Sequence, residues 1–246
     1  MSALSHSALS PASPSSPGAK RLVLVAMDKG GVGKSFFTIL FVQWLQHRAE
    51  RGYLAFDPDY QNSTLTRFVP AAQFLDIRHS ENLDRIIEVM AEQPMVVVDG
   101  VGSQQRIFLD WLEETSLLTL KDEMNLAITL VLIVEEDKDT VHQAGEAVSR
   151  IGRAVDWLVV KNQKTMPTSR IYDNSKARKE LLNCGAKEIL MPKMTDHLVL
   201  FLQQQSFTID RALESDELFL IDRQRIVDYR RKIFNQFDSI KEILLP

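Results

Sequence analysis

The sequence predicts an α/β protein with a doubly wound, mostly parallel sheet and helices on both faces. Short apolar runs rich in β-branched residues alternate along the chain with longer helical patterns, which is the order expected of βαβ units. The runs lack polar alternation, as expected for strands buried on both faces. Because crossovers between parallel strands are right-handed, the carboxyl ends of the strands meet at one edge, where ligands bind in open sheets.

The first expected strand runs directly into the first expected helix. The run RLVLVAM is a buried strand, and the segment after it is too long for a strand, apolar almost all round at first and suited to end at Gly52. Amphipathic patterns favour the later helices. The expected strands are 21–27, 53–57, 95–99, 127–134, 156–163 and 188–194. The expected helices are 35–52, 81–93, 104–114 and 139–152.

Length and composition fit one domain over residues 21–246. The chain has 246 residues, 45% of them hydrophobic, which is enough for a large core. Residues 1–20 are rich in Ser, Pro and Ala and are expected to be a disordered tail without a function of its own. This N-terminal stretch lacks the basic and apolar regions of a secretory signal.

Charge and cysteine content exclude several classes of protein. The net charge is -4, so the chain is not a polycation that coats nucleic acid, and any basic surface is local. A single cysteine, Cys184, allows no intrachain disulfide and fits a reducing cytoplasm. No run approaches the ~18 apolar residues of a spanning helix, so stable membrane insertion is not expected.

The stretch MDKGGVGKSFF joins the first expected strand to the first helix. Gly30, Gly31 and Gly33 let backbone N–H groups approach a phosphate, and the helix adds its positive dipole end. Lys34 is placed to reach β- and γ-phosphates, and the hydroxyl of Ser35 to bind Mg²⁺. The stretch therefore predicts a phosphate-binding loop that holds ATP and Mg²⁺. Asp28 departs from the strict motif, which leaves a glycine turn with a chance lysine as the alternative.

The run KGGVGKS also resembles the deviant Walker A motif of the ParA/MinD family of P-loop ATPases. In that family the early lysine, here Lys29, reaches across an ATP-sandwiched dimer to the partner's nucleotide. The resemblance implies a nucleotide-binding set of Gly30, Gly31, Val32, Gly33, Lys34, Ser35, Phe36 and Asn162. Phe36 stands where relatives often carry a second hydroxyl. The alternative for Lys29 is a solvated loop cation.

Two acidic segments follow strands, as an NTPase requires. The segment FDPDYQN resembles the family's D-x-D-P-Q-G loop, so Asp59 is expected to position or activate the attacking water. MVVVDG matches a Walker B strand that ends in Asp99. The expected Mg²⁺ set is Ser35, Asp57 and Asp99. Tyr60 replaces the usual proline, and the alternative for the first segment is a turn rich in Asp and Asn.

A strand-end amide completes the expected site. Asn162 in VVKNQ resembles the family's asparagine that contacts the adenine edge, and an amide offers that edge both a donor and an acceptor. The alternative is an ordinary turn residue. The loop of Met191, Pro192 and Lys193 is a candidate for the other wall.

The chain ends in an expected amphipathic helix with basic residues between its apolar ones. Packing on the core with a solvated basic face is the default interpretation. Non-specific DNA binding stays open, and a membrane is disfavoured because acidic residues are interspersed. The ending resembles the TraL-like branch of the family, found in conjugative and mobilisable plasmids. The apolar residues are Ile226, Ile233, Phe234, Phe237, Ile240 and Leu244, and the basic ones Arg223, Arg225, Arg230, Arg231 and Lys232.

These resemblances imply a cytoplasmic ATPase that acts as an ATP-dependent dimerisation switch in plasmid transfer, partition or maintenance. Lys29, Lys34 and Asp59 are its expected catalytic residues, and a second copy and a plasmid-encoded protein its expected partners. The rival hypothesis is a scaffold that uses ATP as a structural latch with negligible turnover. A P-loop kinase is a third class, but no acceptor site is evident and Lys29 argues against it.

Overall fold

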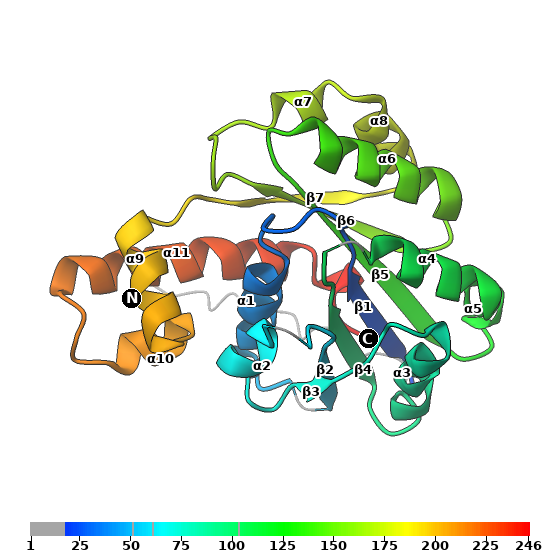
Figure 1. Cartoon of the computed structure of the whole chain (residues 1–246), viewed down its shortest axis with the longest axis horizontal. Coiled ribbons are helices and arrows are strands. Elements are labelled where there is room, and N and C mark those ends of the chain that lie inside the picture. Colours follow the sequence, from blue (N-terminus) through cyan, green and yellow to red (C-terminus); the bar gives the residue numbers. More distant parts are fainter. Residues whose placement is uncertain (1–17, 51, 61, 103) are drawn as a thin grey trace, which may run out of the picture.

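Seven parallel strands form a single sheet in the order β3-β2-β4-β1-β5-β6-β7 (Figure 1). The structure is a computed structural model that describes residues 18–50, 52–60, 62–102 and 104–246. This topology confirms the doubly wound parallel sheet. The strands are β1 (Lys20–Val25), β2 (Tyr53–Asp57), β3 (Gln73–Phe74), β4 (Met95–Asp99), β5 (Leu126–Val134), β6 (Asp156–Asn162) and β7 (Lys187–Met191).

Helices cover both faces of the sheet. Figure 1 shows α1 and α11 on one side and α4, α6 and α8 on the other. The helices are α1 (Lys34–His47), α2 (Thr64–Phe68), α3 (Asp84–Val89), α4 (Gln105–Glu114), α5 (Leu117–Leu120), α6 (Lys138–Ile151), α7 (Arg170–Asp173), α8 (Lys176–Asn183), α9 (Asp196–Gln205), α10 (Ile209–Glu214) and α11 (Leu220–Ser239). Single 3₁₀ turns span Ser80–Leu83 and Lys241–Ile243.

The first helix ends earlier than the sequence predicts. Its last residue is His47, and Ala49 takes a left-handed conformation with φ 55°. The N–H of Glu50 then donates to the carbonyl of Leu45, which closes the helix in the manner of a Schellman motif. The prediction that Gly52 ends this helix is wrong, because Gly52 lies directly before β2.

Helix α11 packs on α1, as the default interpretation of the C-terminal helix expects. The ring of Phe237 meets Phe37 and Phe41 edge-on, with ring centroids 5.7 Å apart in both pairs. Trp44 packs against the same ring and donates to Asp238 through its indole N–H. Because α1 lies between the sheet and α11, it is apolar almost all round in its first turns.

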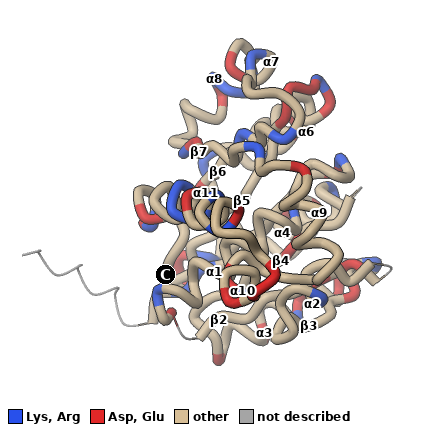
Figure 2. Tube along the Cα trace, turned by 90° about the vertical axis from the view of Figure 1, so that its left-hand side faces the viewer, with Lys and Arg blue, Asp and Glu red and all other residues tan. Residues whose placement is uncertain are grey.

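The basic side chains of α11 are largely used within the chain, beside the acidic residues that Figure 2 shows on the same helix. Arg223 donates to backbone carbonyls of Leu213 and Ser215. Three further arginines form ion pairs, namely Arg225 with Asp222, Arg230 with Asp210 and Arg231 with Asp228. This use of charge weakens the case for DNA binding through α11. Across the described ranges, no helix is both long and apolar enough to span a bilayer.

Arg21 ties the C-terminal segment to the sheet. It is 6% exposed and donates to Oγ1 of Thr129 at 2.8 Å, to Asp156 at 2.7 Å and to the carbonyls of Ile243 and Leu245. A buried guanidinium is stable only when its donors are satisfied. Five bonds to three segments, including one to the carbonyl of Glu242, meet that need.

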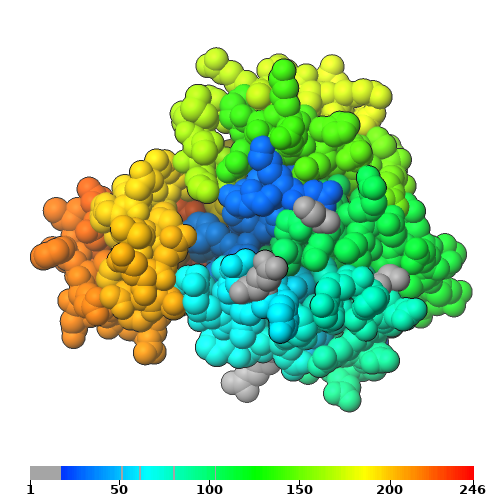
Figure 3. Space-filling model, viewed as in Figure 1, coloured from blue at the N-terminus to red at the C-terminus, as the bar shows by residue number. Residues whose placement is uncertain are grey.

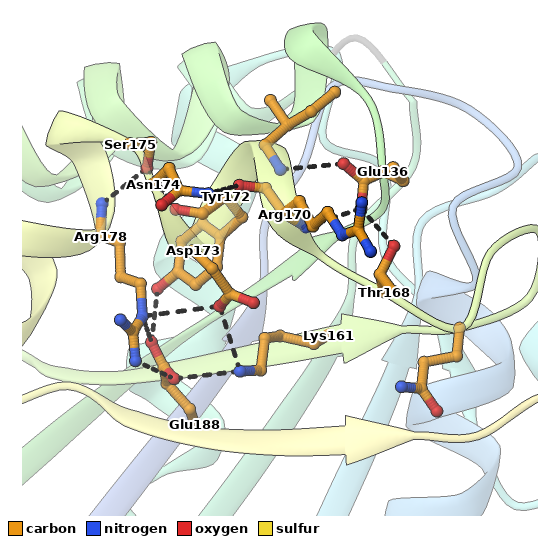
Figure 4. A network of polar contacts seen from close by, with 12 residues as sticks. Glu136, Lys161, Thr168, Arg170, Tyr172, Asp173, Asn174, Ser175, Arg178 and Glu188 are labelled. Atoms are coloured by element: carbon orange, nitrogen blue, oxygen red, sulfur yellow. Dashed lines mark hydrogen bonds and ion pairs between the residues drawn. The ribbon is translucent and has the colours of Figure 1, made fainter.

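A second polar network fixes α7 and α8 to the sheet (Figure 4). Glu188 on β7 accepts from Tyr172, from Arg178 at 2.8 Å and from Lys161. Burial first, and then the Glu188 charge, raise the pKa of the Tyr172 phenol well above its usual range. Glu136 accepts from the backbone N–H groups that begin α7. The network thus anchors both ends of the segment between β6 and α8, which follows Asn162.

Candidate functional site

The glycine loop leads from β1 into α1 at the carboxyl edge of the sheet. Gly33 has φ +95°, and a Cβ there would lie 2.8 Å from Nδ2 of Asn162 and 3.1 Å from Cε of Met191. Only glycine meets both constraints. At Gly30 and Gly31 a Cβ would meet nothing within 4 Å. The loop is therefore tight against β6 and β7 at its end and open at its start, where a ligand can approach the backbone.

Lys34, the first residue of α1, is buried within this loop. The residue is 6% exposed, and its Nζ donates to the carbonyl of Lys29 at 2.7 Å. Burial lowers the pKa of the ammonium group, while the carboxylates of Asp99 and Asp28 oppose that shift. A buried cation held by one loop carbonyl has donors to spare for an anion.

Asp99 ends β4 beside α1. Burial raises its pKa to about 7, although hydrogen bonds from Ser35 and Thr38 lower it; the Asp57 charge raises it further, and that of Lys34 lowers it. The hydroxyl of Thr38 lies 2.7 Å from Oδ1 of Asp99. The site therefore holds a desolvated carboxylate whose charge the protein alone compensates poorly, which is a condition that favours a cation.

Glycine is also required directly after Asp99. A Cβ on Gly100 would lie 1.9 Å from the carbonyl oxygen of Val25. This close approach lets the end of β4 pass against the end of β1. Asp28, the departure from the strict motif, accepts from the N–H of Gln105 at 2.6 Å and so joins the glycine loop to the start of α4.

The carboxylates of Asp57 and Asp59 hold the loop after β2. Asp57 is buried and accepts from the N–H of Asp59 at 3.0 Å and from both the N–H and the hydroxyl of Thr66. Asp59 is half-buried and accepts from the N–H of Asn62 at 2.9 Å and from its side-chain amide at 3.1 Å. Asp57 thus supports the start of α2, and Asp59 is oriented by its own turn.

Lys29 is paired within its own chain. Its Nζ lies 2.7 Å from Asp137 and 3.3 Å from Asp139. Asp137 caps α6, where it accepts from the N–H groups of Asp139 and Thr140. Hydrogen bonding to Asp137 raises the pKa of Lys29, and the same bond lowers the pKa of Asp137. Its charge is thus satisfied before any partner arrives, which neither interpretation of the sequence expects.

Asn162 is 4% exposed and fastens the glycine loop. Its amide donates to the carbonyl of Val32 at 2.8 Å, and its oxygen accepts from the N–H of Lys164 at 3.0 Å. Both ends of the amide are therefore engaged in this structure. Because an amide has two N–H donors and an oxygen with two lone pairs, each end of Asn162 can still make one further hydrogen bond.

A cavity of about 540 Å³ unites most of the predicted residues. Figure 3 shows its mouth as a hollow between the blue glycine loop, the cyan segment of α2 and the gold helix α9. Val32 and Asp57 are buried behind this lining, and Lys29 faces α6 instead. The predicted residues in the lining are Gly30, Gly31, Gly33, Lys34, Ser35, Phe36, Asp59, Asp99 and Asn162.

Some residues of the site are absent from the sequence-based set. Lys164 lines the cavity and donates to the carbonyl of Gly31 at 3.2 Å, and Thr38 joins Asp99 to the backbone of α1. Thr38 could have been predicted from the sequence, because it lies three residues after Ser35 and so on the same side of the helix. The contacts of Asp137 and Asp139 with Lys29 could not be predicted from sequence motifs, because only the order of the strands in the sheet brings these residues together.

The residues fit a nucleotide and Mg²⁺ by their chemistry. An open glycine loop, a helix N-terminus and Lys34 make an anion site. The Ser35 hydroxyl and the Asp99 carboxylate are hard oxygen ligands of the kind Mg²⁺ uses, together with phosphate oxygens. Within the described residues no group of three or more His, Cys, Asp or Glu side chains is placed to hold a metal.

Two curated proteins are similar to this chain over most of its length. No family model matches the chain. Protein MobD of Acidithiobacillus ferrooxidans is 25% identical over 225 residues, which cover 87% of this chain and 95% of MobD. Protein TraL of Escherichia coli is 24% identical over 245 residues, which cover 89% and 98%.

The fold of the chain is similar to that of a solved structure. The MinD cell division protein of Aquifex aeolicus superposes with a TM-score of 0.52 at 13% identity, and the match covers 88% of this chain and 97% of that one. At this identity the likeness concerns the fold alone. The chain therefore has the MinD/ParA-like P-loop fold and is a distant homologue of MobD and TraL.

Proposed function

We propose that the chain is a magnesium-dependent ATPase of the ParA/MinD type, which uses ATP as a dimerisation switch. The observation that carries the proposal is the cluster of Lys34, Ser35 and Asp99 at the open glycine loop. A buried ammonium, a hydroxyl and a carboxylate with a raised pKa face one cavity. This is the donor set that phosphoryl transfer needs, since that reaction depends on positioning and charge neutralisation.

Each group has a separate task in this proposal. The N–H groups of the loop and the ammonium of Lys34 bind the β- and γ-phosphates. Ser35 and Asp99 hold Mg²⁺, which when bound neutralises phosphate charge. Asp59, oriented by Asn62, positions the attacking water. Asp57 supports this loop through the start of α2, so its contribution to the metal is indirect.

The dimer requires Lys29 to change partners. In the proposal it leaves Asp137 and Asp139 and reaches the nucleotide of a second copy. Both side chains of the Lys29–Asp137 pair are about one-third exposed, and exposed ion pairs are cheap to exchange. The similarity to MobD and TraL over nearly their whole length supports a role in plasmid transfer, partition or maintenance, with a plasmid-encoded partner.

Titration calorimetry with Mg²⁺ and ATP, on wild type and Lys34→Ala, tests the proposal. Loss of a charge-assisted contact to phosphate costs roughly 1.5–3 kcal/mol, so affinity should fall roughly 10- to 150-fold. Unchanged affinity in K34A would exclude the phosphate site. Steady-state phosphate release by wild type then separates the switch from the rival, an ATP-latched scaffold, which turns over negligibly.

A further inference from the structure

Three consecutive apolar side chains protrude from the turn between α10 and α11. Phe219 and Leu220 are each 82% exposed, and Ile221 is 66% exposed. Apart from Tyr60, every other large hydrophobic residue in the described ranges is at most 53% exposed. Single exposed apolar residues are common on protein surfaces, whereas a contiguous group is typical of an interaction site. We call these three residues the apolar tip; Figure 1 shows their turn in orange at the left-hand end of the molecule.

The apolar tip lies outside the face through which α11 packs on the core. Phe219 precedes the first helical residue. With 3.6 residues per turn, Leu220 and Ile221 are rotated by roughly a third of a turn from the buried stripe of the helix. The tip therefore contributes little to the core and can contact a partner. The buried stripe consists of Ile226, Tyr229, Ile233, Phe234 and Phe237.

Hydrogen bonds hold the turn that carries the apolar tip. Arg223 donates to the carbonyls of Leu213 and Ser215. The hydroxyl of Ser215 accepts from the N–H of Glu217 at 3.1 Å. The side-chain amide of Gln205, at the end of α9, donates to the carboxylate of Glu217 at 3.2 Å. A surface held in this way loses little conformational entropy when a partner binds.

The sequence around the apolar tip is acidic. Residues 214–222 include four acidic residues and no basic residue. Of the four, only Asp222 forms ion pairs within the described part of the chain, one of them with Arg225 at 2.8 Å. The other three carboxylates, which we call the acidic rim, thus lie beside exposed apolar side chains without a cation. They are Glu214, Asp216 and Glu217.

The charge of the acidic rim selects among the possible occupants of the apolar tip. The rim repels the anionic surface of a bilayer and the phosphates of nucleic acid. A second copy in a two-fold contact would bring the same carboxylates together. A polypeptide that carries lysine or arginine beside apolar side chains is attracted by both features of the surface.

We propose that the apolar tip and the acidic rim dock a basic, amphipathic segment of a partner protein. Apolar side chains of that segment cover Phe219, Leu220 and Ile221, and its ammonium or guanidinium groups meet the rim. The apolar contact supplies most of the affinity, and the charges supply the selectivity. This surface goes beyond the proposed function and does not depend on the nucleotide, because none of its residues lines the cavity at the glycine loop.

The test uses two synthetic helical peptides with the same leucine face, one with lysine and the other with glutamate at every polar position. Their affinities for the full, nucleotide-free chain are measured by fluorescence anisotropy of the labelled peptide. The lysine peptide should bind about ten-fold more tightly, the scale of a few exposed ion pairs. Salt at about 0.5 M should remove most of this preference. Equal affinities, or no binding of either peptide, would overturn the proposal.

Single variants locate the peptide on the apolar tip. Phe219→Ala should weaken binding of the lysine peptide by at least about ten-fold. Phe74→Ala, at an exposed position on β3, is the matched control and should leave binding unchanged. Neither variant removes a buried side chain, so both should unfold at the urea concentration of wild type. If F74A weakens binding and F219A does not, the peptide binds elsewhere and the inference is wrong.

A charge-matched pair of variants tests the acidic rim. Converting all three rim carboxylates to amides should remove most of the preference for the lysine peptide. The control makes the same change in net charge at three exposed glutamates elsewhere and should keep the preference. Equal effects of the two variants would show that only the net charge of the chain matters, which contradicts the proposal. The control positions are Glu81, Glu88 and Glu92.

Two further measurements test the other occupants. Sedimentation with vesicles of phosphatidylcholine, alone or with phosphatidylglycerol, should show no binding that depends on Phe219. Sedimentation velocity should give the same mass for the nucleotide-free wild type and F219A. If wild type binds vesicles or self-associates and F219A does not, the tip is a membrane anchor or a dimer contact, and the proposal is wrong. Lys34→Ala should keep the preference for the lysine peptide while it loses ATP affinity, so a failure of the nucleotide site is seen separately.

Discussion

Lys29 and Asp137 form an ion pair within one chain, with Nζ 2.7 Å from Oδ2. The pair joins the glycine loop to the cap of α6, and Lys29 also donates its backbone N–H to Gln143 at 3.1 Å. Any contact of Lys29 with a second copy must compete with these carboxylates. If Lys29 acts in trans, the pair is therefore a restraint that opposes dimerisation.

Neutralising the carboxylate should release that restraint. Asp137→Asn keeps a side-chain oxygen to cap α6 but removes the charge that holds Lys29. With a non-hydrolysable ATP analogue, we expect D137N to dimerise about two- to five-fold more tightly than wild type, the scale of an exposed pair. Light scattering after size exclusion measures the change.

Lys29→Ala gives the opposite result in the same assay. The ATP affinity of the K29A monomer should stay within a few-fold of wild type. The variant should lose analogue-induced dimerisation and ATP turnover, since dimerisation and nucleotide affinity are linked. ADP serves as the control nucleotide. If K29A dimerises as well as wild type, Lys29 is a loop cation with local partners only.

Most strands of the sheet can be predicted from the sequence because each is a short apolar run that can be recognised without its neighbours. Strands β4 and β5 are almost entirely apolar and are buried on both faces, so their positions can be predicted from the sequence. The two-residue strand β3 has no such pattern, since both of its residues are exposed. The end of α1 was missed because Ala49, and not glycine, takes the left-handed conformation.

In the candidate site, too, some residues can be predicted from local sequence, whereas other contacts arise only from the fold. Lys34 and Ser35 follow from local spacing, because a phosphate loop is contiguous in the chain. The partner of Lys29 does not, since Asp137 is brought to it by the pairing of β1 with β5. The engagement of Asn162 with Val32 is likewise a tertiary contact over 130 positions. Sequence motifs indicate which groups are present, and the fold decides what each one contacts.

Asp59→Ala should bind ATP but release phosphate slowly. The carboxylate faces the cavity and is oriented by two bonds from Asn62. Loss of a positioning or basic group typically costs about 10²–10⁴ in rate, whereas binding energy resides mainly in the glycine loop. Nucleotide affinity by calorimetry and phosphate release are measured separately, with Asn62→Ala as an intermediate case. Phosphate release at the wild-type rate in D59A would assign the water to another residue.

Arg21→Ala should destabilise the fold without changing nucleotide affinity. It removes bonds from β1 to the C-terminal segment and takes the Arg21 donor from the carbonyl of Leu245, whereas the carbonyl of Ile243 still accepts from the hydroxyl of Thr129. Breaking such a buried network costs about 3–5 kcal/mol. Urea unfolding measures the loss, and Arg153→Ala, at an exposed position, should stay within about 0.5 kcal/mol of wild type. A similar value for both variants would show that the network contributes nothing.

Asp99 should make stability depend on pH in the metal-free protein. Burial raises its pKa to about 7 from an ordinary 3.8. Between those values the folded chain keeps a proton that the unfolded chain has released, so the free energy of unfolding falls as pH rises, by at most about 1.4 kcal/mol per pH unit. Above pH 7 both states are ionised, and this contribution becomes constant.

Asp99→Asn isolates that contribution from all other titrating groups. The amide stays neutral at every pH, and its oxygen still accepts from Thr38. The stability of D99N minus that of wild type should therefore grow from pH 5 to pH 7 and then level off, in urea unfolding with EDTA present. A difference that is constant with pH would mean that Asp99 is ionised throughout this range and that its charge is already compensated by Lys34. In that case the buried carboxylate would have no electrostatic need for a cation beside Ser35.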